Sequence, residues 1–269
     1  MILLLSPRKA ELGIRMSKRA APPQSGSQAR RQSKQRRQLR QKVIFCFAII
    51  TTILAALFAL KLMPYRSDLL ALRQEQASLP ELSPFDAKWL EINPDYVGWL
   101  KINGTDISYP VVRGVDNEKY LNMTFQGKEN ILGAIFMDYR CVGQALPHII
   151  IYGHQLSDIS NNKYMFGGLH DFLDARFLEQ NPVIMFMENN LLSVFDIYSA
   201  RKTDINDPAY HLDFSHPDSF ADFLEKNGAP ADATQIITLS TCYEGDDDER
   251  RVVVQGSLRH VVPGGMDVP

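Results

Sequence analysis

Two apolar segments near the C-terminus decide the fold: TQIITLSTC at residues 234–242 and RRVVVQGSL at residues 250–258. Both are rich in Val, Ile and Thr, and the acidic sequence YEGDDDE lies between them. Short segments of β-branched residues bounded by polar residues are typical of β-strands. We therefore expect two strands joined by a loop, with Cys242 at the end of the first strand.

Similar segments recur towards the N-terminus. Asn103-Gly104 separates the first two of them, which is a strong hairpin signal. HIIIYGH, residues 148–154, is almost wholly apolar and predicts a central, buried strand. The other predicted strands are VGWLKI at 97–102, TDISYPVV at 105–112, ILGAIFMDY at 131–139, VIMFM at 183–187 and LSVFDIYSARKT at 192–203, the last two joined by a turn at 188–190. About eight strands in one domain predict a closed or nearly closed β-barrel, which removes exposed strand edges.

Helical patterns in this part of the chain are short. We predict helices at residues 67–76, 83–92, 165–173 and 215–227, the last one followed by Gly228. With 269 residues, 45% of them hydrophobic, the chain can bury one good-sized core. The predicted fold class is therefore mainly β, with short helices around a barrel of about eight strands.

A membrane-spanning helix is predicted ahead of this domain. Residues 43–60, VIFCFAIITTILAALFAL, carry no charge, and Leu62 and Met63 extend the apolar segment. At about 1.5 Å per residue this length just crosses a hydrocarbon core of roughly 30 Å. Twelve Lys or Arg residues against one acid lie within residues 1–42, which predicts a cytoplasmic N-terminus and an extracellular domain after Pro64.

A cleaved signal peptide is the alternative interpretation of this region. The apolar segment is longer than the roughly 7–15 residues of a signal core, and no A-x-A cleavage site follows it. The basic arm, residues 17–42, is rich in Ser, Gln and Arg, and we expect it to be disordered and to touch anionic lipid. Because an apolar span follows the arm, the membrane and not nucleic acid is the predicted partner.

Cys242 has the setting of a reactive thiol. It ends an apolar strand and precedes a loop, so it is predicted to be partly exposed. Arg250 and Arg251 begin the next strand, and only one of them can share a face with its inward residues. A cation near the thiol lowers the thiol pKa or holds the oxyanion formed when a carbonyl is attacked. Ser240 and Thr241 are expected to lie beside the substrate by their position alone.

His154 is the predicted base. Of six histidines, it alone directly follows an apolar strand, in the sequence Tyr152-Gly153-His154-Gln155. His148 begins the same strand, and we interpret it as a structural residue. A Cys and a His far apart in sequence, each at a strand end, form the usual thiol–base pair of acyl-transfer enzymes.

The other cysteines allow a different interpretation. Cys46 lies in the predicted span, which leaves Cys141 and Cys242 outside, where cysteines usually pair. A Cys141–Cys242 disulfide would make the chain a membrane-tethered, non-catalytic β-barrel binding module. No metal-ligand, nucleotide-binding or other cofactor motif stands out, so no cofactor is predicted.

The sequence also resembles a known family. LSTC at 239–242, followed nine residues later by Arg251, is similar to the sortase active-site signature, and IYGH at 151–154 resembles the histidine motif of that family. Four further segments resemble the class B branch of this family in particular: NPDYVGWLKINGTDISYPVV at 93–112, DNEKYLN at 116–122, GAIFMDYR at 133–140 and MFGGLHDF at 165–172. The likeness runs from about Phe85 to Leu258.

This resemblance implies a sortase-like barrel with Cys242 as nucleophile, His154 as acid/base and Arg251 as the oxyanion or substrate-positioning residue, its register set by Gly256 and Leu258. It implies that secreted proteins with a C-terminal sorting motif are the substrates. The acceptor amine would come from a peptidoglycan precursor of the cell wall, or from a pilin lysine in a pilin-linking sortase. Water as acceptor would make the same site a hydrolase.

The predicted organisation follows from these interpretations. It consists of a basic cytoplasmic tail at 1–42, a transmembrane helix at 43–63 in contact with lipid, an extracellular stalk at 64–84, a catalytic domain at 85–260 and a C-terminal tail at 261–269. Because two arginines are adjacent in the sequence, Arg250 is an alternative residue for part of the role expected of Arg251. The acidic loop at 246–249 is predicted to be a solvated loop, with a cation site or an electrostatic filter as the alternative.

Overall fold

The structure, a computed structural model, describes residues 25–78, 86–143, 146–157, 161–242 and 249–263. The chain divides into two compact units that meet between Lys61 and Leu62. The first unit contains most of helix α1, and the second contains all the strands.

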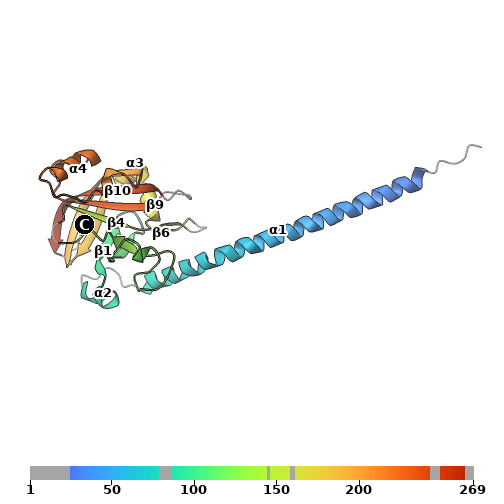
Figure 1. Cartoon of the computed structure of the whole chain (residues 1–269), viewed down its shortest axis with the longest axis horizontal. Coiled ribbons are helices and arrows are strands. Elements are labelled where there is room, and N and C mark those ends of the chain that lie inside the picture. The colour runs from blue at the N-terminus through green and yellow to red at the C-terminus, as the bar shows by residue number, and fades with distance from the viewer. Residues whose placement is uncertain (1–24, 79–85, 144–145, 158–160, 243–248, 264–269) are drawn as a thin grey trace, which may run out of the picture. The chain divides into compact units, whose positions relative to one another are not determined.

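Eight strands of the second unit form a closed barrel, as predicted (Figure 1). Around the barrel the order is β1, β2, β3, β4, β9, β10, β8 and β7, and β7 pairs with β1 to close it. Their bounds are Tyr96–Ile102 (β1), Ser108–Val112 (β2), Ile135–Met137 (β3), His148–Tyr152 (β4), Val183–Glu188 (β7), Leu191–Asp204 (β8), Ile236–Cys242 (β9) and Arg250–Pro263 (β10). Side chains such as Ile150 and Val253 are completely buried, as expected for strands that are covered on both faces.

The pairing of three strands brings distant segments to one mouth of the barrel. β4 and β9 run parallel, with Tyr152 opposite Ser240, so both strands end at the same mouth. β10 runs antiparallel to β9 and begins there, with Arg251 opposite Cys242. The chain after β4, the end of β9 and the start of β10 therefore meet, although the sequence separates the first from the other two by almost ninety residues.

Short helices precede the first strand or lie between later ones. They are α2 (Asp86–Ile92), η1 (Lys119–Leu121), η2 (Gly167–Leu173), α3 (Ala175–Gln180), η3 (Pro208–Tyr210) and α4 (Ser219–Asn227). α4 ends as predicted at Gly228, which has a φ of 62° and accepts the left-handed geometry of a helix C-terminus. Phe223 and Leu224 of α4 pack on Ile236 at the start of β9.

Several details differ from the sequence predictions. β3 has three residues rather than nine, because Gly133, with a φ of 60°, turns the chain just before it. The helix expected at 165–173 is the 3₁₀-helix η2, and Met165 belongs to a strand instead. The two-stranded sheet of β5 (Gln155–Ser157) and β6 (Lys163–Met165), and helix α3, were not predicted. The predicted start of α2, residues 83–85, lies outside the described residues.

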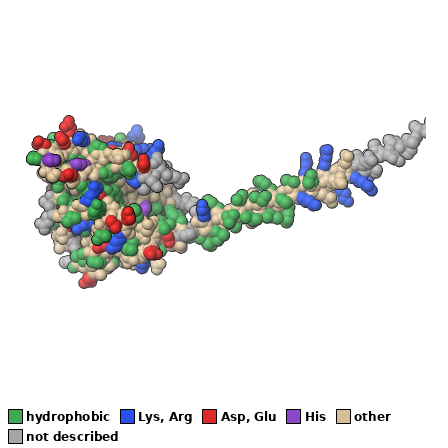
Figure 2. All heavy atoms as spheres, viewed as in Figure 1, with side chains coloured by type: hydrophobic (Ala, Val, Ile, Leu, Met, Phe, Trp, Pro, Cys, Tyr) green, Lys and Arg blue, Asp and Glu red, His purple; other side chains and the backbone are tan. Residues whose placement is uncertain are grey.

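Helix α1 runs from Ser25 to Ser78 and includes the predicted helix at 67–76. It contains a stretch that is long and apolar enough to cross a membrane by length and composition. Figure 2 shows hydrophobic side chains along its middle and Lys and Arg side chains in its N-terminal part. The expectation of disorder is wrong for residues 25–42, which are helical. Gln, Lys, Arg and Ala have high helix propensity, so this polar arm continues the apolar helix.

Candidate active site

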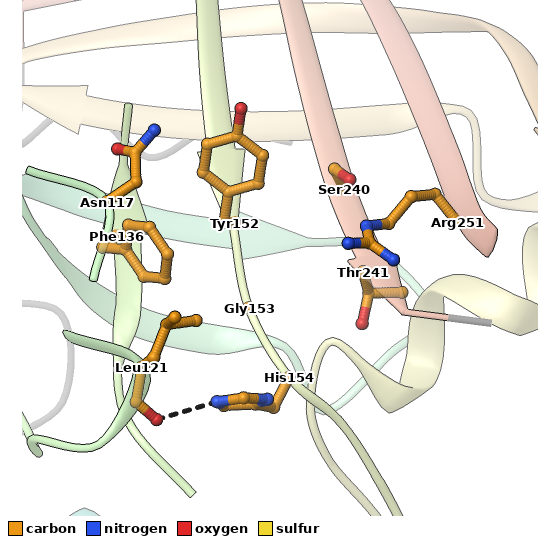
Figure 3. Close-up of a pocket in the computed structure, with 9 residues that line it drawn as sticks. All are labelled: Asn117, Leu121, Phe136, Tyr152, Gly153, His154, Ser240, Thr241 and Arg251. Atoms are coloured by element: carbon orange, nitrogen blue, oxygen red, sulfur yellow. Dashed lines mark hydrogen bonds between the residues drawn. The ribbon is translucent and has the colours of Figure 1, made fainter. Parts of the chain in front are cut away.

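A pocket of about 190 Å³ lies at the barrel mouth where β4, β9 and β10 meet. Its lining residues are Asn117, Leu121, Phe136, Tyr152, Gly153, His154, Ser240, Thr241 and Arg251 (Figure 3). Four of the five predicted site residues, His154, Ser240, Thr241 and Arg251, are therefore brought together by the fold. The fifth, Cys242, is described by its backbone as the last residue of β9, and its side chain lies outside the described part of the structure.

Backbone contacts fix the position of His154. The Gly153 amide donates to the Ser240 carbonyl at 3.2 Å, and the Phe166 amide donates to the His154 carbonyl at 2.9 Å. A Cβ at position 153 would lie 2.4 Å from Ile135 Cδ1 and 2.9 Å from Phe166 Cγ, so any larger residue would require these side chains to shift. These contacts hold the backbone of His154, just after the end of β4, at the edge of the pocket.

The imidazole of His154 makes one described hydrogen bond, between Nε2 and the Leu121 carbonyl oxygen at 2.8 Å (Figure 3). A carbonyl oxygen can only accept, so Nε2 carries the proton. In the neutral ring, Nδ1 then keeps its lone pair and can take up a second proton. This arrangement suits a residue that must both accept and donate a proton.

The strand register selects Arg251 over Arg250. Arg251 lies opposite Cys242 in the β9–β10 pairing and lines the pocket, whereas Arg250 is exposed and does not line it. Nη1 of Arg251 donates to the Arg250 carbonyl at 2.9 Å. Most of the acidic loop, residues 246–248, lies outside the described residues.

Ser240 and Thr241 differ in their surroundings although both are buried. The Ser240 hydroxyl shares a hydrogen bond of 2.8 Å with the Tyr210 hydroxyl, and the Tyr210 ring stacks on Tyr152 with 6.5 Å between centroids. The Thr241 hydroxyl has no hydrogen-bond partner among the described residues. The hydrogen-bonding capacity of this buried hydroxyl is therefore not used within the described structure.

A buried carboxylate, Asp138, supports the opposite wall. It accepts hydrogen bonds from Arg140 through Nε and Nη2, from Tyr152 Oη at 3.0 Å and from Asn117 Nδ2 at 3.1 Å. Burial raises the pKa of Asp138, but the hydrogen bonds from Arg140 and Tyr152 outweigh this effect and hold the pKa below the usual carboxyl range. Asp138 therefore remains ionised and fixes two pocket residues.

Sequence reasoning missed Asn117, Asp138 and Tyr210 as members of this site. An Asp two residues before an Arg, in MDYR, was a weak signal for the pair at 138 and 140. Nothing in the sequence pointed to Tyr210, because its link to Ser240 joins segments 30 residues apart.

Cys141, the other cysteine of the barrel unit, does not line this pocket. Cys141 is a buried, free thiol, which removes the disulfide on which the binding-module interpretation depended. Burial raises the pKa of Cys141 to about 11. Among the described residues, no group of three or more His, Cys, Asp and Glu side chains has the arrangement of a metal site.

Comparison with known sequences identifies the family. The sequence model of the sortase domain matches residues 100–259, more than half of the chain. This chain belongs to the sortase family. Sortase B of Listeria monocytogenes is 34% identical over 166 residues, an alignment that spans 56% of this chain and 64% of that relative. The chain thus covers less than two thirds of the relative.

Solved sortase structures share the fold. The Staphylococcus aureus sortase B–substrate complex matches with a TM-score of 0.58 and 28% sequence identity. The match covers 72% of this chain and 92% of the chain in that complex. A sortase B complexed with triglycine matches with a TM-score of 0.58 and 27% sequence identity. The match covers 76% of this chain and 97% of the chain in that structure. The predicted resemblance to class B sortases is therefore confirmed.

Proposed function

We propose that this sortase is a cell-surface cysteine transpeptidase that cleaves a C-terminal sorting signal and transfers the acyl group to an amine. Members of the sortase family are cysteine transpeptidases, and the relatives are class B. The observation that carries the proposal is the meeting of three elements at one pocket. β9 ends at Cys242, Arg251 lies opposite it on β10, and His154 follows the parallel neighbour β4.

The first step forms a thioester. The Cys242 thiolate attacks the carbonyl carbon of the scissile peptide bond, and the negative charge moves to the carbonyl oxygen. The Arg251 guanidinium, a permanent cation, stabilises this oxyanion or holds the substrate. When the intermediate collapses, the C–N bond breaks and protonated His154 gives its proton to the leaving amine.

The second step releases the acyl group. A primary amine attacks the thioester carbon while neutral His154 takes up one of its protons, and the Cys242 thiolate leaves as the new amide forms. A peptidoglycan precursor of the cell wall is the proposed amine donor. The similar sortase B that was solved with triglycine, a peptide with a free amino group, supports an acceptor of this chemistry.

Ser240 and Thr241 are proposed to contact the substrate from the pocket wall. We also propose that residues 43–63 anchor the enzyme in the cell membrane, with the N-terminus cytoplasmic and the catalytic domain outside. Twelve basic residues before the apolar segment support this orientation. Protease accessibility on intact cells tests it, since an N-terminal tag should be protected and the barrel should be digested.

Mass spectrometry tests the proposed reaction directly. The full-length protein in detergent micelles is incubated with a panel of sorting-signal peptides, with and without amines that include triglycine and a lysine-containing pilin peptide. A transpeptidase gives an acyl adduct on Cys242 that the amine discharges as a new peptide product. The preferred amine separates cell-wall anchoring from pilin linking, and discharge by water alone would identify a hydrolase. Absence of an adduct with every peptide would contradict the proposal.

A further inference from the structure

The part of helix α1 that follows the apolar segment has one face that contacts the catalytic domain. We call residues Tyr65–Arg73 the stem. The stem residues that contact the domain are Tyr65, Asp68, Leu69, Leu72 and Arg73, whose spacing of three or four places them on one side of a helix. Leu69 and Leu72 are 8% and 3% exposed within the main core cluster, whereas Leu70 is 63% exposed. The stem is therefore a packed element of the domain and not only a spacer.

One contact of the stem is with the β5–β6 sheet. Tyr65 Oη donates to the Ser157 carbonyl of β5 at 3.2 Å. The Arg73 guanidinium donates to the Tyr164 hydroxyl of β6, and its central carbon lies 4.9 Å from the centre of the Tyr164 ring. The stem thus holds both strands of this small sheet.

The β5–β6 sheet is directly attached to the catalytic histidine. β5 begins at Gln155, the residue after His154, and Gln155 pairs with Met165 of β6. The Phe166 amide, one residue further, donates to the His154 carbonyl. Any movement of this sheet therefore moves the backbone of His154.

A second contact of the stem reaches the segment that binds the imidazole. Asn130 Nδ2 donates to the Asp68 carbonyl of the stem at 3.1 Å. The Asn130 amide donates to the Asn122 carbonyl at 3.0 Å, and Asn122 follows Leu121, whose carbonyl accepts from His154 Nε2. The stem is thus joined to both segments that hold His154: the sheet that follows it and the loop that provides its hydrogen-bond acceptor.

We propose that the stem is a positioning element for His154, which it acts on through the β5–β6 sheet and the Leu121–Asn130 segment. Its catalytic consequence rests on the proposed function, whereas its effect on the imidazole does not. A stem that served only as a spacer would leave His154 unchanged when its inward contacts were removed.

The test uses the full-length protein in detergent micelles with the variants Arg73→Ala and Arg73→Lys. Lys keeps a cation that can donate to Tyr164 and lie over its ring, so it should restore most of the effect. The matched control is Arg259→Ala, which removes another exposed arginine, paired with Asp196 on the β8–β10 side of the barrel. Each variant is compared for hydrogen exchange in residues 155–157 and 163–165, for the ¹⁵N signals of the His154 ring, and for peptide transfer.

Arg73→Ala should speed hydrogen exchange of the β5–β6 sheet by about fivefold, the effect of losing one hydrogen bond of ordinary net strength at an exposed site. It should also weaken the signal of the Nε2–H···O bond of His154 and lower kcat by about three- to tenfold with KM unchanged. Arg259→Ala should change none of these. Wild-type exchange and ring signals in Arg73→Ala would overturn the proposal, as would faster exchange with an unaltered His154 ring. If the wild-type protein transferred no peptide, the proposed function would fail, while exchange and ring signals would still decide the role of the stem.

Discussion

The two ends of strand β4 carry the same residue types in opposite settings. At its start, His148 is buried, both of its ring nitrogens have partners, and the thiol of Cys141 lies 4.0 Å from its carbonyl oxygen. Just past its end, His154 is half-buried in a pocket, and Cys242 ends the neighbouring strand. Residue type alone therefore does not make a site. The difference lies in burial and hydrogen bonding: both ring nitrogens of His148 have partners inside the protein, whereas His154 makes one described hydrogen bond and lines the pocket at the barrel mouth.

The buried surroundings of His148 and Cys141 favour neutral, unreactive groups. His148 Nδ1 lies 2.8 Å from the His211 carbonyl and Nε2 lies 2.7 Å from the Thr238 hydroxyl, while the Phe223 ring packs at 4.6 Å. Burial lowers the pKa of His148 to about 4. This histidine joins the barrel to the segment that carries Tyr210 and α4, which supports the wall behind Ser240.

The largest expected effect separates the two thiols. Cys242→Ala should lower peptide transfer by about 10⁴-fold or more, because the proposed nucleophile is lost. Cys141→Ala should keep kcat within about twofold, since Cys141 is buried and does not line the pocket, and its cost should be about 1 kcal/mol of stability from lost packing. Steady-state transfer kinetics and thermal denaturation measure both. Transfer activity that survived in Cys242→Ala would refute the assigned nucleophile.

The next largest effect should distinguish the two histidines by their influence on turnover and on stability. His154→Gln should lower kcat by about 10³-fold, because general acid–base catalysis contributes about 10²–10⁴-fold, and should leave the melting temperature almost unchanged. His148→Gln should instead lower the melting temperature while the folded fraction keeps its kcat. The reverse pattern, with stability lost at residue 154 and turnover lost at residue 148, would show that the ends of β4 were assigned wrongly.

Thiol alkylation sharpens the same comparison without a substrate. A thiol with a pKa of about 11 has roughly 100-fold less thiolate at neutral pH than an ordinary thiol, and burial protects it further. We expect iodoacetamide to modify Cys242 at least about 100-fold faster than Cys141 in the folded protein, and both at similar rates in urea. Peptide mapping by mass spectrometry reads each site separately. Equal rates in the folded protein would place Cys242 in a closed environment too.

Much of this contrast could be predicted from the sequence, because a strand is recognised from the pattern of a few neighbouring residues. The apolar run before Gly153 and the β-branched run before Cys242 indicated two buried strands and their ends. Because successive side chains of a strand point to opposite faces, the sequence indicated that only one of Arg250 and Arg251 could be the cation of the site. Each of these signals lies within about ten residues of the side chain that it concerns.

The missed features depend on distant pairings. The β5–β6 sheet has three residues per strand, too few for a periodic pattern. Asp138 belongs to the site because β3 pairs with β4, which brings Tyr152 to its carboxylate. The helix at 67–76 was predicted, but nothing local says which of its leucines are buried or which surface they meet.

The last expected effect is on stability alone: a pH dependence that arises from the buried His148. The unfolded chain protonates His148 near pH 6.5, whereas the folded protein keeps it neutral down to about pH 4. Between these values the unfolded state binds more protons, so the free energy of unfolding should decrease as the pH falls from 6.5 towards 4. The decrease contributed by His148 should reach about 3 kcal/mol. Asp138, whose pKa is lowered by its hydrogen bonds, contributes in the same direction only below its unfolded pKa of 3.8, so the two effects separate.

Urea unfolding of the full-length protein in micelles measures this dependence at several pH values. The buried pair Trp89 and Trp99, with ring centres 4.7 Å apart, provides the fluorescence signal. His148→Gln removes the titrating group and should flatten the slope between pH 6.5 and 4.5. An unchanged slope in His148→Gln would mean that another group controls acid stability. The burial of His148 would then not explain the acid dependence of stability, and the contrast between the two histidines would have to rest on the pocket at His154 alone.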